Sequence, residues 1–188
     1  EYCKDDSFST QKQWVSIDHI SPYMVQAVVA SEDNNFMKHR GFDWTAIERA
    51  IDHNKTSTRL QGASTISQQV AKNVFLWPKR SYLRKGLEVY FTFLIETFWS
   101  KERIMEVYLN VIETGKGVYG VEATAQKFFK KPASKLTRGE AAMIAITLPS
   151  PLNRKLNSPT QYMFKRQSDI LLLMEKIGPI NLNPSTAE

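Results

Sequence analysis

The segment SPYMVQAVVASE, residues 21–32, decides the class of fold. Ser21 is a residue type that caps helices, and Pro22 follows it at the first helical position, where the missing N–H does no harm. The residues behind this proline are mostly apolar: Met24, Val25, Ala27, Val28 and Val29. The pattern predicts an apolar helix, and Glu32 stands at its end.

Similar helix signals recur along the rest of the chain. Capping-box spacing joins Thr65 with Gln68, Thr137 with Glu140 and Ser158 with Gln161, and further candidate caps are Asp43, Ser81 and Ser100. Gly178-Pro179 is a stop signal for the last helix. No segment combines clean alternation with many β-branched residues, so strand signals are scarce. The sequence therefore predicts a mainly α fold of about eight or nine helices.

Size and composition fit one globular domain. The chain has 188 residues, of which 42% are hydrophobic and 23% charged, which favours a packed core over a disordered chain. We expect a single domain over residues 1–188, with its core at about residues 14–178. The only cysteine, Cys3, excludes an intrachain disulfide and a cysteine-based metal site. No apolar run is long enough to span a bilayer, so we expect either a soluble protein or one whose N-terminal membrane anchor lies outside this sequence.

Positive charge gathers in one part of the chain. The net charge is +6, and no acidic residue lies between Asp52 and Glu88. The cations of this basic segment are Lys55, Arg59, Lys72, Lys79, Arg80, Arg84 and Lys85. Two interpretations stay open: a solvated face, or a phosphate cradle in which Arg binds bidentately and Lys acts as a point charge. The polar residues 52–62 at its start are expected to form a mobile loop.

Residues 87–99 are apolar almost all round. One interpretation buries this helix in the core. The other buries one side and lets the opposite side, with Phe75, Leu76 and Trp77, dip into a membrane interface.

Residues 32–41, EDNNFMKHRG, resemble the opening signature of the peptidoglycan glycosyltransferase family, in which Glu-Asp is followed by Phe, His and Gly at fixed offsets. Four more signatures follow in the family order: residues 62–73 (GASTISQQVAKN), 84–88 (RKGLE), 101–110 (KERIMEVYLN) and 138–151, which begins RGEAA and ends LPSP. One departure is Thr114, where an aromatic residue is expected before the glycine turn.

The resemblance implies both a fold and an activity. The implied fold is a lysozyme-like, bilobal, mainly α domain with a mobile loop between the first two signatures. The implied activity is an inverting glycosyl transfer that polymerises lipid II into β-1,4-linked glycan strands and releases undecaprenyl pyrophosphate, in bacterial cell-wall synthesis. The chain ends soon after Gly178 and resembles the monofunctional form of the family, which has no transpeptidase domain.

Such a reaction needs a base for the acceptor hydroxyl and cations for the leaving pyrophosphate. An isolated Glu at a helix end is ordinarily a solvated carboxylate, but its place in the first signature implies that Glu32 is the base. Partial burial at the end of an apolar helix would raise the pKa of this carboxyl toward a useful range. The resemblance implies that Glu88 is a second essential carboxylate, which either holds a basic phosphate ligand in place or binds substrate directly. In the first signature we expect Asp33 to orient the loop and His39 to be a structural hydrogen-bonding residue, and Phe36 joins the expected substrate-binding set.

The expected pyrophosphate clamp is Lys72 with Arg80, and Arg49 is a weaker third candidate. The alternative for each is an ordinary surface cation. The remaining expected substrate-binding residues lie in the second signature: Ser64, Thr65, Gln68, Gln69 and Asn73. Ser64 and Thr65 stand at a helix N-terminus, where free N–H groups bind phosphate, or they are only caps.

The donor brings its own charged leaving group, so no cofactor or metal is required, although a divalent cation (Mg or Mn) can assist a pyrophosphate. Expected partners are lipid II, the growing lipid-linked glycan strand, the membrane surface and proteins of the cell-wall synthesis machinery. No nucleic-acid-binding motif occurs. The resemblance implies the periplasmic face of the bacterial inner membrane, a single-pass N-terminal anchor, and competition by moenomycin for the cleft.

Two other functions stay open at this point. A lytic enzyme on the same scaffold acts on finished peptidoglycan and needs a general acid, but it has little use for a pyrophosphate clamp. A non-catalytic lipid or nucleic-acid binder suits the positive charge and the aromatic residues, but it has no need of Glu32 and Glu88. The basic segment favours the glycosyltransferase over the lytic enzyme.

Overall fold

The computed structural model describes residues 10–57, 62–79 and 81–183. Its α-helices are α1 (Pro22–Glu32), α2 (Trp44–Thr56), α3 (Ile66–Phe75), α4 (Tyr82–Phe98), α5 (Lys101–Val111), α6 (Val121–Thr124), α7 (Arg138–Thr147) and α8 (Gln161–Ile177). Short 3-10 helices lie at Ile17–His19 and Ala133–Lys135, and a π-helical turn lies at Ala125–Phe129. The strands are β1 (Gln11–Lys12), β2 (Glu113–Gly115) and β3 (Val118–Tyr119). The mainly α prediction is confirmed.

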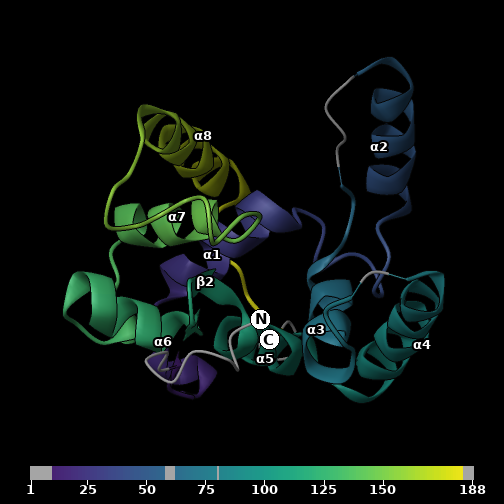
Figure 1. Ribbon diagram of the computed structural model, residues 1–188, viewed down its shortest axis with the longest axis horizontal. Helices are drawn as coiled ribbons and strands as arrows, with labels where there is room; N and C mark the ends of the chain where they lie inside the picture. The colour runs from purple at the N-terminus through teal and green to yellow at the C-terminus, as the bar shows by residue number, and fades with distance from the viewer. Residues whose placement is uncertain (1–9, 58–61, 80, 184–188) are drawn as a thin grey trace.

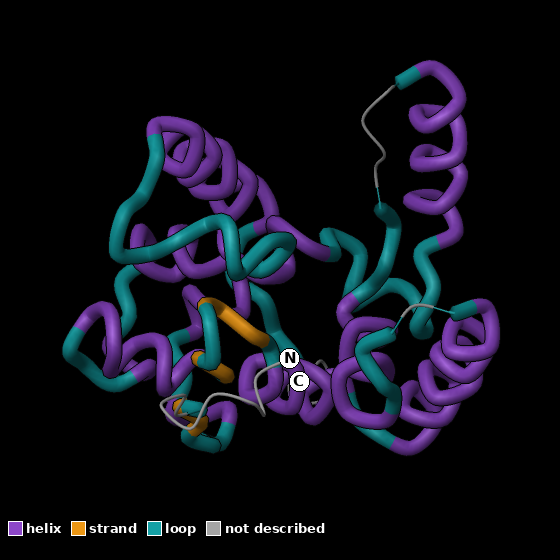
Figure 2. Tube along the Cα trace, in the orientation of Figure 1, coloured by secondary structure: helices purple, strands orange, loops and turns teal. Residues whose placement is uncertain are grey.

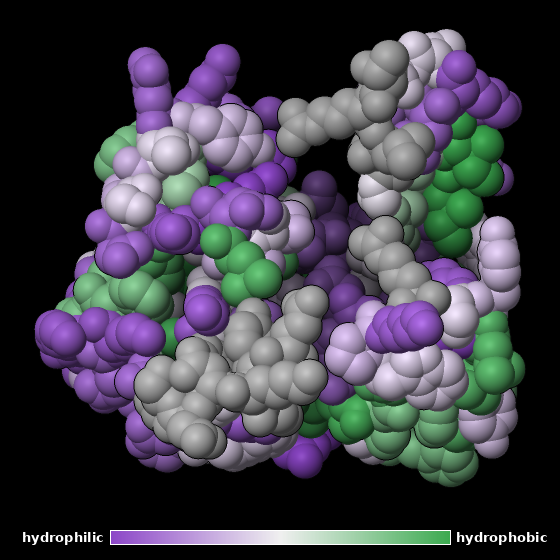
Figure 3. All heavy atoms as spheres, viewed as in Figure 1, coloured by the Kyte–Doolittle hydropathy of each residue, from purple (hydrophilic) through white to green (hydrophobic). Residues whose placement is uncertain are grey.

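The helices form two groups (Figure 1), and the space-filling view shows a hollow between them (Figure 3). In one group α1, α7 and α8 pack against one another, and in the other α3 packs against α4 and α5. One hydrophobic core runs through both groups, with α1 supplying Met24, Val28 and Val29 and α5 supplying Ile104 and Leu109. Helix α2 stands apart as an arm, and Ala50 is its only buried residue.

Local capping explains where most helices begin. Pro22 opens α1 at its first position. The Asp43 side chain accepts a hydrogen bond from the backbone of Ala46 at 2.9 Å and caps α2. The capping boxes of Thr65 and Thr137 are both formed, at the starts of α3 and α7. These contacts confirm the helix starts expected from sequence, and Gly178 (φ 68°) ends α8 as expected.

Two local predictions are wrong. The cap of α8 is Thr160, whose hydroxyl accepts from the backbone of Met163, and not Ser158. Of the loop expected at residues 52–62, Asp52 to Thr56 continue α2, because no helix breaker interrupts them and Lys55 pairs with Asp52 at 2.9 Å. Residues 58–61 lie outside the described residues.

A small sheet replaces the simple turn expected near Thr114. Its strand order is β1-β3-β2, with β1 parallel and β2 antiparallel to β3 (Figure 2). Strands of two or three residues are too short to show alternation, so sequence patterns miss them. At Thr114, where an aromatic residue was expected, the side chain is buried. Its hydroxyl is hydrogen-bonded to the Thr124 hydroxyl at 2.5 Å.

Helix α4 buries one side only. Glu88, Thr92 and Ile95 are its buried residues, whereas Tyr90, Phe93 and Phe98 are exposed. The interpretation that buries this helix all round is therefore wrong. Figure 3 shows apolar surface gathered on the side of the molecule formed by α2 and α4. Within the described part of the chain, no helix is both long enough and apolar enough to cross a membrane.

Gly120 makes the turn into α6 possible, and its substitution is expected to destabilise the folded protein. Its φ is 82°, and a Cβ there would lie 2.8 Å from the carbonyl oxygen of Asn110. Gly120→Ala is expected to lower the free energy of unfolding by at least about 2 kcal/mol, measured by urea denaturation. The matched control is Gly86→Ala in α4, where nothing lies within 4 Å of the added Cβ. Equal stabilities of the two variants would contradict this account of the turn.

Candidate active site

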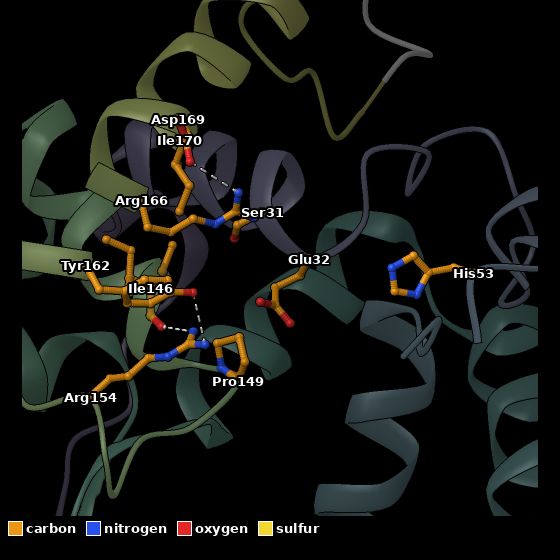
Figure 4. Close-up of a pocket in the computed structure, with 11 residues that line it drawn as sticks. Ser31, Glu32, His53, Ile146, Pro149, Arg154, Tyr162, Arg166, Asp169 and Ile170 are labelled. Carbon is orange, nitrogen blue, oxygen red and sulfur yellow. Dashed lines mark hydrogen bonds and ion pairs between the residues drawn. The ribbon is translucent and has the colours of Figure 1, made fainter. Parts of the chain in front are cut away.

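Glu32 is the last residue of α1 and faces the hollow between the two helix groups. It lines a cavity of about 530 Å³ beside α7 and α8, and another of about 250 Å³ beside α2. In Figure 4, Arg154 and Arg166 lie on one side of Glu32 and His53 of α2 lies on the other. A ligand can therefore approach this carboxylate from the cleft.

Hydrogen bonds from the opposite helix group orient the carboxylate. Gln69 of α3 donates from Nε2 to Glu32 Oε2 at 3.0 Å. The hydroxyl of Tyr108, from α5, donates to Gln69 Oε1 at 3.3 Å. The second oxygen of Glu32, Oε1, has no hydrogen-bonding partner among the described residues, so it is available to a ligand.

Burial sets the protonation of Glu32. Desolvation is the largest influence and raises the pKa of the carboxyl above its usual 4.5. The hydrogen bond from Gln69 and the positive charges of Arg154 and Arg166 pull this pKa down in part, and the negative charge of Asp33 raises it. A carboxyl with a raised pKa takes up a proton more readily near neutral pH, as a general base must.

Asp33, next to the candidate base, ties three segments together. Its Oδ1 accepts from His39 Nε2 at 2.8 Å, and its Oδ2 accepts from the backbone N–H of Ile66, at the start of α3, at 3.0 Å. His39 Nδ1 accepts from the backbone of Gly41 at 3.1 Å, which leaves the ring proton on Nε2. Both side chains are almost fully covered. These hydrogen bonds hold the loop that follows Glu32 against the start of α3.

Of the expected substrate-binding residues, Phe36 lies in the core, and Thr65 and Gln68 are mostly buried. Phe36 is fully buried in the core, with the Lys101 ammonium 4.5 Å from its ring centroid. The Thr65 hydroxyl donates to the carbonyl of Gly41 at 2.7 Å, and Thr65 with Gln68 forms the capping box of α3. Thr65 still lines the 250 Å³ cavity and Gln68 lines a pocket of about 230 Å³, so their expected contacts with substrate stay predictions.

A cation-bearing pocket of about 490 Å³ lies between the C-terminal half of α3 and residues 148–151. Lys72, Asn73 and Gln69 line it from α3, and Arg84 lines it from α4. The Nε of Arg84 is buried and has no hydrogen-bonding partner, so this guanidinium has unused capacity for an anion. Arg84 belongs to the basic segment for which a phosphate cradle was one interpretation, although the expected pyrophosphate clamp was Lys72 with Arg80.

Glu88 lies beneath these cations and is only 4% exposed. Its carboxylate accepts from Lys85 Nζ at 2.6 Å and lies 3.5 Å from Arg84 Nη1. Of the two roles expected for Glu88, these contacts fit the one that holds a basic ligand in place. The other expected role, direct contact with substrate, stays a prediction, since Glu88 also lines a small pocket with Lys72.

The other expected residues lie around the same hollow. Ser64 lines both the 250 Å³ cavity and a small pocket of about 230 Å³ with Lys72 and Glu88. Arg49 is exposed, lines the 250 Å³ cavity and donates from Nε to the carbonyl of Thr45 at 3.1 Å. Arg80 lies outside the described residues.

The cavity of 530 Å³ holds residues that sequence reasoning missed. Arg154 comes from the loop after α7, and Tyr162 and Arg166 come from α8. The one available signal was that Arg154 follows the fifth signature by three positions. No pattern in α8 singles out Arg166, because its role depends on where α8 packs against α1.

Residues 10–57, 62–79 and 81–183 contain no group of three or more His, Cys, Asp or Glu side chains placed to hold a metal ion. That no metal is required, and that a divalent cation can assist, both stay predictions. Glu32 and several cations line the pockets around the hollow, an arrangement suited to an anionic substrate that also loses a proton.

Comparison with known proteins gives one consistent result. The transglycosylase family profile matches residues 4–175. Proteins named biosynthetic peptidoglycan transglycosylase are 59% identical over 164 residues in Bacteroides thetaiotaomicron, covering 87% of this chain and 66% of that protein. The match in Mannheimia succiniciproducens is 52% over 174 residues (93% and 71%). That in Escherichia coli strain K12 is 55% over 172 residues (91% and 71%). The chain thus spans about two thirds of the length of these relatives.

Glu32→Gln is expected to make the fold more stable at neutral pH. A carboxyl whose pKa is raised by folding binds its proton more tightly when folded, so its ionisation costs stability. That cost is absent below the unfolded pKa of about 4.3 and complete once the pH exceeds the raised folded value. Urea unfolding at several pH values measures the difference between variant and wild type, which is expected to grow as the pH rises.

Glu48→Gln, an exposed position in α2, is the control for that experiment. If Glu32→Gln were less stable than wild type at pH 7, the ionised carboxylate would stabilise the fold, and this prediction would be wrong.

Proposed function

This chain belongs to the transglycosylase family, and on that premise we propose that it polymerises lipid-linked disaccharides into β-1,4-linked glycan strands for the bacterial cell wall. The donor and acceptor are lipid II or the growing lipid-linked strand. The observation that carries the proposal is the position of Glu32, between a cavity large enough for a sugar and a pocket lined by Lys72 and Arg84.

Glu32 acts as the general base in one displacement step. The oxygen of the acceptor 4-hydroxyl forms a bond to the anomeric carbon of the donor while its proton passes to Glu32. The bond from that carbon to the phosphate oxygen breaks, and its electron pair leaves on the pyrophosphate. The free Oε1 of Glu32 is the natural proton acceptor, since Oε2 already accepts from Gln69.

Lys72 and Arg84 supply the positive charge that the leaving pyrophosphate requires. Both line the pocket next to Gln69, which itself touches Glu32. The guanidinium of Arg84 offers a planar set of donors, and the ammonium of Lys72 is a compact charge. Glu88 holds Arg84 and Lys85 in position from below. This assigns to Glu88 a positioning role in the reaction.

The lytic alternative is not favoured. A raised pKa at Glu32 would serve a general acid as well as a general base, so the carboxylate alone does not separate the two reactions. The cation pocket separates them, because finished glycan carries no pyrophosphate at the bond to be cut. The relatives of this chain are named for biosynthesis.

A membrane surface is the proposed environment, at the periplasmic face of the inner membrane. The exposed aromatic residues of α4 and Trp77, at the end of α3, offer an apolar face of the kind that enters a lipid interface. This face lies in the helix group that carries the cation pocket, which suits a substrate anchored by its lipid. Proteins of the cell-wall machinery are further proposed partners, a divalent ion is optional, and moenomycin is a proposed competitor.

Glu32→Gln is expected to abolish polymerisation, with a loss of at least about 100-fold in rate. The reason is that the amide cannot take up the acceptor proton. The measurement supplies lipid II in detergent micelles and resolves glycan polymer by gel electrophoresis, with Glu48→Gln as the matched control. A parallel reaction supplies purified glycan. Polymer formation by Glu32→Gln at the wild-type rate, or cleavage of finished glycan by wild type without polymer formation, would sink the proposal.

A further inference from the structure

The hydroxyl of Tyr108 is a buried donor to which the proposed reaction gives no role. Tyr108 lies on α5, which packs directly against α3, and its side chain is fully buried. Burial, and after it the negative charges of Glu32 and Asp33, raise the pKa of this hydroxyl well above its usual 10.0. The hydroxyl therefore keeps its proton at neutral pH and is a permanent hydrogen-bond donor.

That hydroxyl has one partner. It donates to Oε1 of Gln69 at 3.3 Å, and it has no other hydrogen-bonding partner among the described residues. Gln69 in turn donates from Nε2 to Oε2 of Glu32 at 3.0 Å. The three side chains thus form one chain of hydrogen bonds, which runs from the interior of α5 through α3 to the proposed base at the end of α1.

The Tyr108 hydroxyl selects the orientation of the Gln69 amide. An ionised carboxylate only accepts hydrogen bonds, whereas an amide donates at its nitrogen and accepts at its oxygen. If the amide were turned over, its oxygen would face the carboxylate of Glu32, and two acceptors would repel each other. Because Tyr108 offers a donor on the far side, the amide oxygen is held there and the NH2 group faces Glu32.

The same hydroxyl strengthens the contact between Gln69 and Glu32. A hydrogen bond accepted by an amide oxygen polarises the amide, so its N–H groups become better donors. A stronger N–H donor favours the charged form of a carboxyl and opposes the desolvation that raises the pKa of Glu32. Tyr108 therefore acts on the base through Gln69.

Other charged or titratable groups surround Glu32 and Gln69. They are Asp33 after α1, Asp43, Arg49 and His53 on the side of α2, Lys72 on α3, Arg154 in the loop after α7, and Arg166 and Asp169 on α8. Removal of the Tyr108 hydroxyl leaves every one of these charges in place. A change in the titration of Glu32 on its removal therefore reports on the chain of hydrogen bonds.

We propose that Tyr108 is a positioning residue, which fixes the Gln69 amide with its NH2 group toward Glu32 and so keeps the base oriented to receive the acceptor proton. The inference rests on the proposed function and extends it to the buried side of the catalytic centre. Tyr108 also borders the cation pocket, so direct binding of the donor is the alternative that the test has to separate.

The test measures the Glu32 carboxyl itself. Its ¹³C resonance is titrated in wild type and in Tyr108→Phe, beside the pH dependence of kcat/KM for lipid II. Loss of the hydroxyl is expected to raise the midpoint of Glu32 by about 0.5 pH unit, part of the value of one hydrogen bond, and to move the acid limb of kcat/KM upward by the same amount. An unchanged midpoint would overturn the proposal.

The Michaelis constant separates positioning from substrate binding. At a pH above both acid limbs, Tyr108→Phe is expected to change KM for lipid II by less than about twofold, because Tyr108 acts on the base and not on the donor. A larger rise in KM without a shift of the Glu32 midpoint would mean that Tyr108 binds the donor directly, against the proposal.

Thr114→Val is the matched control for loss of a buried hydroxyl. The Thr114 hydroxyl is hydrogen-bonded to that of Thr124, and Thr114 lines none of the three pockets around Glu32 and Lys72. This variant is expected to lose some stability and to leave the Glu32 midpoint at its wild-type value. An equal shift in Thr114→Val and Tyr108→Phe would mean a general loosening of the fold and would contradict positioning by Tyr108.

A double-mutant cycle shows whether Tyr108 acts through Gln69. Gln69→Met removes the amide and is expected to raise the Glu32 midpoint by itself, because the hydrogen bond from Gln69 lowers the pKa of Glu32. Tyr108→Phe in the Gln69→Met background is expected to add no further shift. The same shift in both backgrounds would refute action through Gln69.

A second substitution keeps the result decisive should Tyr108→Phe fold poorly. Tyr108→3-fluorotyrosine keeps the hydroxyl and makes it a stronger donor, because the fluorine withdraws electrons from the ring. It is expected to lower the Glu32 midpoint below the wild-type value, a shift of opposite sign to that of Tyr108→Phe. No shift, or a shift upward, would speak against the proposal.

Failure of the proposed function has a different signature. If the acid limb of kcat/KM does not follow the Glu32 titration even in wild type, the assignment of the base is refuted and the inference falls with it. If the limb follows Glu32 in wild type and Tyr108→Phe moves neither, only the role of Tyr108 is refuted.

Discussion

The hydrogen bond from Gln69 to Glu32 joins the two halves of this molecule at the point where its chemistry is proposed to occur. Glu32 ends a helix of one group, and Gln69 lies on α3 in the other group. One residue further along, Asp33 accepts from the first backbone N–H of α3. These contacts set the position of the carboxylate relative to Lys72, which follows Gln69 by one helical turn. Helix α3 therefore fixes both the proposed base, through Gln69, and Lys72, which it carries.

Burying Glu32 in the cleft lowers the stability of the fold, and the packing of α1 offsets this loss. Burial raises the pKa of Glu32, so its charged form is disfavoured at neutral pH. Helix α1 is buried from Met24 to Ala30 and packs against α7 and α8, and this apolar contact holds its last residue in the cleft. A strained or desolvated group that lowers stability is common where a protein does chemistry. Arg154 and Arg166, which line the cavity of about 530 Å³, lessen this cost because their positive charges favour the ionised carboxylate.

Local signals in the sequence predicted the parts of the structure that depend on near neighbours. The capping boxes at Thr65 and Thr137 and the helix that ends at Glu32 are set within a few residues, and the structure has them. What failed depends on distant contacts. The exposed side of α4 and the burial of Phe36 follow from which helices pack together. The cavity of about 530 Å³ brings Glu32 together with Arg154 and Arg166, which lie about 120 positions or more from it along the chain, beyond any local pattern.

The most direct test of the central claim compares the protonation of Glu32 with the rate of the reaction. The protein is labelled with ¹³C in its glutamate side chains, the Glu32 carboxyl resonance is assigned with Glu32→Gln, and its titration is followed beside the pH dependence of kcat/KM for lipid II. The account predicts that the carboxyl titrates above 4.5 and that activity falls, as the pH is lowered, with the same midpoint. A Glu32 that titrates at or below 4.5, or an acid limb that does not follow it, would contradict the assignment of this carboxylate as the base.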